Sequence, residues 1–141
     1  MNKLNHIHDE ECIKLIKDKF PDFLPYLESY LEDFGSDLGL SIQMIPFGEY
    51  TLDQAKSHND SELKKIFDLV EFLLNQGDES VKDAMATCFL EYLMSKDPDE
   101  FKFSTFVRYL GEHSINYCRA WDEFTGVRTE GLWGNDKPAT D

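Results

Sequence analysis

Apolar positions recur at helical spacing over most of the chain. Between His8 and Phe20 they fall three or four residues apart, and Lys residues gather toward the end of the stretch. Both features are typical of an amphipathic helix. Pro21 interrupts this pattern and also suits a first helical position. A second helix is therefore expected from Pro21 to the C-cap residue Gly35.

The clearest pattern lies in the middle of the chain. Asn59 precedes a run with one apolar stripe that ends at Gly77, which predicts a capped, amphipathic helix. Asp78 can cap the next helix, which reaches Met94 and is apolar nearly all round. We expect this second helix to be central and buried. The short gap between the two predicts an antiparallel hairpin.

Two further helices are expected toward the C-terminus. Residues 97–100 read Asp-Pro-Asp-Glu, which matches a helix start, and Gly111 would end that helix. The last helix is predicted from about Ser114 to Phe124. Residues 127–141 then form a tail in which Leu132 and Trp133 are expected to dock.

Residues 36–59 lack a clear helical pattern. Leu40 to Ile45 alternates between apolar and polar residues, and Pro46 and Gly48 then interrupt. We predict a long connection with a short extended segment near residues 40–50. The expected fold is thus all-α, a single domain of about six helices in antiparallel pairs, with residues 1–126 as the helical domain.

The balance of acidic and basic residues limits which partners the protein can have. The 141 residues include 28 acids and 14 bases, for a net charge of −14. Nucleic acids and anionic membranes would repel such a protein, so neither is expected as a partner. The N-terminus has no signal-peptide pattern, and the chain has no apolar run of membrane-spanning length. Three cysteines without a C-x-x-C pair indicate a reducing compartment. We expect a cytoplasmic location.

The acids are unevenly distributed. No Lys or Arg occurs between Phe20 and Ala55, whereas seven acids do. Acids without nearby bases favour a docking surface for a basic partner, although a solvated helix face that aids solubility is the alternative reading. Tyr50 would serve as an aromatic anchor, unless it packs beneath its own segment. The candidate partner-binding residues are Glu28, Glu32, Asp33, Asp37, Glu49, Tyr50 and Asp53.

Candidate chemistry is sparse. The sequence contains no nucleophile-elbow, phosphate-loop or zinc-protease motif. The one cluster similar to a metal site is His6 and His8 with Cys12, but no second ligand pair follows it. We therefore expect no enzymatic activity, no metal and no cofactor.

Several short motifs resemble a family of small bacterial proteins associated with polymorphic toxin systems. They are Phe-Pro-Asp-Phe at 20–23, Tyr-Leu-Glu-Asp-Phe-Gly at 30–35, Phe-Leu-Glu-Tyr-Leu at 89–93 with Val81 and Ala84 before it, Tyr-Leu-Gly at 109–111, and Ser114 with Tyr-Cys-Arg-Ala-Trp at 117–121. This resemblance implies an immunity protein of the contact-dependent growth inhibition kind, which binds a cognate toxin C-terminal domain. Such toxins are commonly nucleases with basic surfaces. The alternative is a regulatory or scaffold module that binds host proteins.

Overall fold

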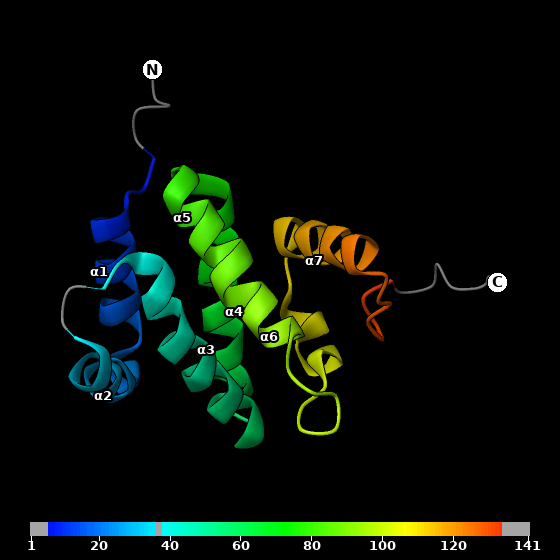
Figure 1. Cartoon of the computed structure of the whole chain (residues 1–141), viewed down its shortest axis with the longest axis horizontal. Coiled ribbons are helices and arrows are strands. Elements are labelled where there is room, and N and C mark those ends of the chain that lie inside the picture. The colour runs from blue at the N-terminus through cyan, green and yellow to red at the C-terminus, as the bar shows by residue number, and fades with distance from the viewer. Residues whose placement is uncertain (1–5, 36–37, 134–141) are drawn as a thin grey trace.

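The computed structural model describes residues 6–35 and 38–133, which form one all-α domain (Figure 1). The only β pairing in this part of the chain is a bridge between Ile7 and Gly77. None of its helices has the length and apolar content needed to cross a membrane. The elements are α1 (Asp9–Lys19), a 3-10 turn (Pro21–Phe23), α2 (Leu24–Phe34), α3 (Leu40–Lys56), α4 (Asp60–Gln76), α5 (Glu79–Asp83), a π-helical segment (Ala84–Leu90), α6 (Glu91–Met94), a 3-10 helix (Phe103–Tyr109) and α7 (Glu112–Thr125).

One continuous rod, formed by α5, the π-helical segment and α6, lies at the centre of the domain (Figure 1). It packs against α3 on one side and α4 on the other. Most of its apolar residues are buried, with Phe89 and Leu90 fully so. The predicted central helix and its hairpin with α4 are confirmed. Asn59 and Asp78 cap α4 and α5 through their side chains, as their positions predicted.

The prediction for residues 36–59 is wrong, because residues 40–56 form helix α3 rather than a connection with an extended segment. Pro46 lies inside this helix and removes one backbone hydrogen bond, a cost of about 3 kcal/mol. Burial outweighs that cost, since α3 places Met44, Phe47 and Thr51 in the interior at helical spacing. Gly48 is also buried, because the ring of Tyr92 on α6 packs directly against it.

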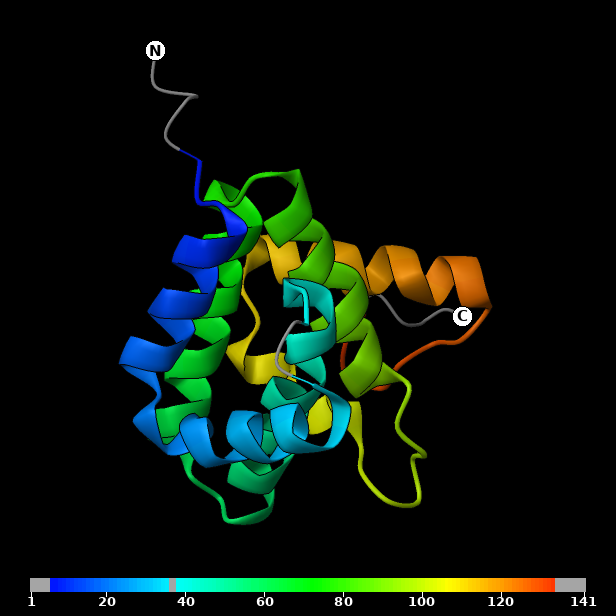
Figure 2. The ribbon, with the colours of Figure 1, turned by 60° about the vertical axis from the view of Figure 1, so that its left-hand side comes forward.

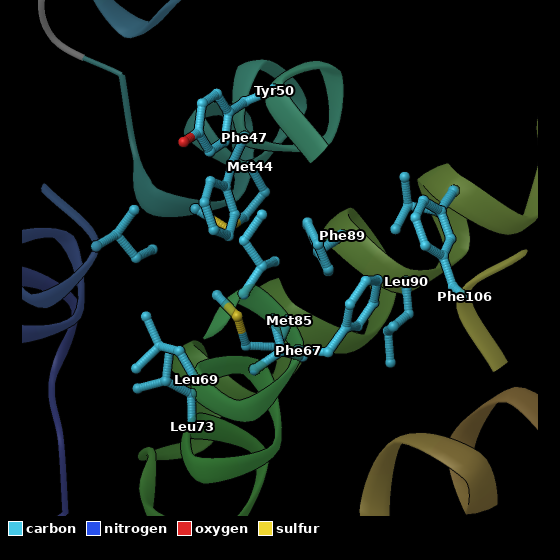
Figure 3. Packing of buried hydrophobic residues seen from close by; sticks show 14 of the residues in the cluster. Met44, Phe47, Tyr50, Phe67, Leu69, Leu73, Met85, Phe89, Leu90 and Phe106 are labelled. Carbon is cyan, nitrogen blue, oxygen red and sulfur yellow. The ribbon is translucent and has the colours of Figure 1, made fainter. Parts of the chain in front are cut away.

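Aromatic rings link the helices through the core (Figure 3). Phe47 on α3 lies 5.1 Å from the ring of Phe23 and 5.2 Å from that of Phe89. On the far side of the rod, Phe67 on α4 lies 4.9 Å from Phe106. Such tilted ring pairs add to the free energy gained by burial. The core thus runs without interruption from the α1–α2 turn to the 3-10 helix.

The predicted helix after residue 97 is also wrong. The Asp-Pro-Asp-Glu motif forms only a turn, and Phe103–Tyr109 is a 3-10 helix. A 3-10 helix repeats every three residues. Phe103 and Phe106 therefore share one face and pack edge to face at 5.7 Å. Tyr109, one turn further on, stacks on Phe67 at 6.2 Å.

α7 ends at Gly126, which has a left-handed φ of 80°, and the chain then folds back. Leu132 is buried, and the indole nitrogen of Trp133 donates to Asp122 Oδ2 over 2.9 Å. The same carboxylate accepts from the Thr129 amide and hydroxyl. A buried acid on α7 thereby holds the segment that follows the helix.

Candidate partner-binding surface

A surface hollow of about 290 Å³ lies where α2 runs beside α3. Two carboxylates, three polar or aromatic side chains and two apolar residues line it, namely Asp33, Glu49, Tyr26, Ser29, Tyr30, Ile45 and Pro46. None of these lining residues is basic. The hollow therefore combines aromatic faces and an apolar floor with uncompensated negative charge.

Glu49 also lines a second hollow, of about 380 Å³, toward the loop after α6. Its other lining residues are Leu52, Asp53, Lys56, Lys96, Glu100 and Phe101. Lys96 reaches over the ring of Tyr92, with its ammonium 4.4 Å from the ring centroid. Together we call the two hollows the α2–α3 acidic surface. Glu49 stands between them and contributes to both.

Tyrosine hydroxyls hold the carboxylates of this surface. Tyr92 Oη donates to Glu49 Oε2 and Tyr26 Oη donates to Asp53 Oδ2, each over 2.5 Å. The bond to Asp53, together with burial, raises the pKa of Tyr26 to about 12. Burial and the bond to Glu49 likewise raise the pKa of Tyr92. Because the phenols stay neutral at physiological pH, they fix these two carboxylates in place without cancelling their charge. The bases of the surface are Lys56 and Lys96, which line the second hollow.

Of the predicted residues, Glu49 shares one hollow with Asp33 and the other with Asp53. Glu28 and Glu32 are exposed on α2. At 100° per residue they lie on the flank opposite to the side that carries Tyr26 and Tyr30. They add to the overall charge but do not line either hollow. Asp37 lies outside the described residues.

The role proposed for Tyr50 as a surface anchor is wrong for this structure. The side chain is only 1% exposed and packs edge to face on Tyr26, with ring centroids 5.3 Å apart. Its hydroxyl donates to Glu62, and burial with this bond raises its pKa. The accessible aromatic residues are instead Tyr30 and Phe34, whose rings lie 4.6 Å apart. Phe34 is 62% exposed.

A pattern in the sequence could have identified these aromatic residues. Tyr26 and Tyr30 are four residues apart on a predicted helix, and so are Tyr30 and Phe34, which puts all three on one side. In the sequence, Tyr30 and Phe34 fall at helical spacing on the helix expected from Pro21 to Gly35, and this spacing alone does not show what they face. Their partner helix, α3, was not predicted, so the surface between the two helices could not be recognised.

The cluster of His6, His8 and Cys12 is spread out in the structure. Cys12 is fully buried, and this burial raises the pKa of its thiol to about 12. His8 Nδ1 lies 2.9 Å from Asp78 Oδ2, and this bond raises the pKa of the imidazole. Within residues 6–35 and 38–133, no three potential metal-ligating side chains come together.

The fold and this surface define a small, acidic, all-α protein. The chain belongs to the family described as Domain of unknown function (DUF7674), which matches residues 13–126. That range includes α2, α3 and both hollows. The comparison with curated proteins finds no match. No solved structure matches the chain either.

Proposed function

We propose that this chain is a non-catalytic immunity protein that binds and neutralises a cognate basic toxin domain through the α2–α3 acidic surface. The observation that carries the proposal is the hollow between α2 and α3. There Asp33 and Glu49 stand beside the half-buried rings of two tyrosines, and no basic side chain lines the hollow. A Lys or Arg side chain of a partner would find carboxylates and ring faces in one place.

The net charge of the whole chain supports the same assignment. A field from −14 charges draws a basic partner toward the molecule and raises the association rate. Once in contact, Tyr30 and Phe34 supply the kind of aromatic contact that slows dissociation. Charge thus provides fast encounter, and the aromatic residues provide residence time.

The choice of a toxin as partner rests on the sequence resemblance described above. Inhibitors of that class act in the cytoplasm of the producing cell, where three free thiols are stable. A toxin with a basic surface would complement the hollow in charge. The same surface would also serve a regulatory module that binds basic host proteins, so the experiment below separates the two.

The test is a pull-down with tagged protein from the source cell at about 50 mM and about 500 mM salt, a range across which surface electrostatics is progressively screened. We expect one basic partner, near a 1:1 ratio, that is recovered at low salt and reduced at high salt. Expression of that partner alone should be toxic, and co-expression of this chain should relieve the toxicity. A non-toxic host protein recovered in its place would support the regulatory module and contradict the immunity role.

A matched pair of double variants locates the interface. Asp33→Asn with Glu49→Gln neutralises the hollow but keeps the shape of each side chain. Glu28→Gln with Glu32→Gln removes the same amount of charge from the opposite flank of α2. We expect the first pair to weaken partner binding at least about tenfold more than the second. Equal effects of the two pairs would mean that only the overall charge matters, and would exclude the hollow as the interface.

A further inference from the structure

A larger hollow, of about 610 Å³, lies on another face, between α1 and α4. The two helices run side by side in Figure 2. However, α1 packs mainly on α5 and on the 3-10 turn Pro21–Phe23 that follows α1, rather than on α4. The space between them remains open to solvent. It is lined by Leu15 and Lys19 from α1 and by Lys65, Asp68, Leu69 and Phe72 from α4.

The two helices are antiparallel, which orders the lining residues along the groove. At one end the Ile7 amide, just before α1, donates to the Gln76 carbonyl at the end of α4 over 2.9 Å. At the other end Lys65, near the start of α4, lies 5.9 Å from the ring of Phe20, which follows Lys19. Lys19 and Lys65 therefore share one end of the groove, and the lining residues beyond them are Asp68 and three apolar side chains.

The charges at the groove are not balanced. No acid of residues 6–35 and 38–133 lies within ion-pair distance of Lys19. Lys65 is exposed and pairs once, at 3.4 Å, with the half-buried Glu62. Asp68 also lines the groove but is paired with Lys64 at 3.1 Å. The ammonium groups of Lys19 and Lys65 thus lie at one end of the groove.

Apart from Asp68, the rest of the groove lining is apolar. Leu69 forms part of its floor and is 5% exposed. Phe72, one turn further along α4, is 46% exposed and presents an apolar ring to the groove. Leu15 faces them from α1. The lining therefore changes from cationic to apolar along the groove.

We infer that this groove binds a single-chain aliphatic carboxylate, with the carboxylate between Lys19 and Lys65 and the chain along Leu15, Leu69 and Phe72. The volume lies in the range of about 300–1,000 Å³ that is typical of small-molecule sites, where a mainly apolar lining carries a few polar groups. The charge complementarity is local, because the net charge of −14 makes the protein repel anions elsewhere on its surface. A second copy of the chain is a poor occupant of the groove, since it would bring another net charge of −14.

This inference does not depend on the proposed function, because the groove and the α2–α3 acidic surface share no residue. The test is a calorimetric titration of the full chain with dodecanoate below its micelle concentration. We expect saturable 1:1 binding with a Kd of about 10 µM. Dodecyltrimethylammonium has the same chain and the opposite charge, and it should bind at least about tenfold more weakly.

Two pairs of variants assign the binding to the groove. Lys19→Glu with Lys65→Glu should weaken dodecanoate binding at least about tenfold, and Lys56→Glu with Lys102→Glu provides the same change of net charge elsewhere. Phe72→Ala should weaken binding several-fold, and Phe124→Ala is its control, because Phe124 is 80% exposed on α7. All these side chains are exposed, so the helical circular dichroism should not change.

Three results would overturn the inference. They are a titration without saturable heat up to about 1 mM ligand, equal binding of the cationic amphiphile, and equal loss of binding in the groove variants and their controls. Chemical-shift changes in an NMR titration provide an independent readout. They should cluster at Leu15, Leu69 and Phe72, whereas changes centred on Phe124 would also exclude the groove.

Discussion

The ring of Tyr92 on α6 lies so close to Gly48 on α3 that a Cβ atom at Gly48 would stand 2.5 Å from Tyr92 Cδ2. The same ring carries the hydroxyl that holds Glu49. Close approach of the two helices and the position of a carboxylate in the α2–α3 acidic surface therefore depend on one glycine. This glycine looked like a helix breaker in the sequence, but its small size is what the packing of the rod requires.

Gly48→Ala should destabilise the protein by about 1–2 kcal/mol. Alanine gains up to about 1 kcal/mol in helix propensity, but the clash with Tyr92 costs more, because the ring atoms involved are not at a flexible end. The free energy of unfolding from urea titration measures the balance. In a Tyr92→Ala background the clash is absent, and the same substitution should become stabilising. A cost that is equal in both backgrounds would rule out Tyr92 as its cause.

Glu71→Gln should destabilise α7. The Glu71 carboxylate on α4 accepts from the backbone amides of His113 and Ser114, at 2.8 and 3.0 Å. It thus caps the start of a helix from a different part of the chain. We expect a loss of about 1–2 kcal/mol in the free energy of unfolding. Glu123→Gln, on the exposed side of α7, should change it little.

The same cap predicts a dependence on pH. Burial raises the pKa of Glu71, but the hydrogen bonds from His113 and Ser114 outweigh it and hold the pKa below the ordinary 4.5. A carboxyl with a lowered folded-state pKa contributes its full stabilisation above 4.5 and loses it as the pH falls through the folded value. The difference in stability between the native chain and Glu71→Gln should therefore shrink below pH 4.5. A difference that stays constant to low pH would contradict this role.

Asp122→Ala should release the segment after α7. Its carboxylate accepts from the Thr129 amide over 2.7 Å and from Trp133. Without it these donors lose their buried partner, at a cost of about 3 kcal/mol. We expect faster tryptic cleavage after Arg128 and a red shift of tryptophan fluorescence, while the helical circular dichroism is retained. Unchanged cleavage would show that Leu132 alone holds the segment. Glu123→Ala is the neighbouring control.

The three thiols should differ in reactivity. Cys12 and Cys118 are fully buried, and burial raises the pKa of each to about 12. Because the thiolate is the reactive form, neither should be alkylated while the protein is folded. Cys88 is half-buried and should react first. Mass spectrometry after brief iodoacetamide treatment measures the order. Early labelling of Cys12 would indicate that α1 detaches readily from the domain.

Phe34→Ala should shorten the life of the complex with a basic partner. The ring is 62% exposed and stacks on Tyr30, so its removal should cost the free protein little stability. We expect a dissociation rate several-fold higher and an association rate almost unchanged, since the acids that steer encounter remain. Surface plasmon resonance separates the two rates. The control is Phe124→Ala, and an equal effect of both would contradict a contact at Phe34.

The sequence predicted the helices whose pattern is set by local chemistry. α4 and the central rod carry capping side chains at Asn59 and Asp78 and an apolar face that needs burial, so each begins and packs as expected. The all-α class followed from these elements. α3 was missed because Pro46 and Gly48 disfavour a helix locally, and tertiary contacts with the rod, α2 and α4 stabilise it.

The candidate site was predicted in part, for a similar reason. The stretch without bases between Phe20 and Ala55 supplies both acids that line the hollow between α2 and α3, Asp33 and Glu49. Whether Tyr50 faces solvent or the core depends on the packing of α3 against α2, which no local pattern encodes. The α1–α4 groove is likewise a property of two helices distant in sequence.

The tyrosine hydroxyls that hold Glu49 and Asp53 also affect the solvent around the protein. Since a phenol does not neutralise a carboxylate, and no base lines the hollow of Asp33 and Glu49, we expect small cations from solution to gather over that hollow. A basic partner that docks there would displace them, and their release would favour binding through the entropy of the freed ions. Its affinity would then depend on the concentration of cations in the cell as much as on the contacts themselves.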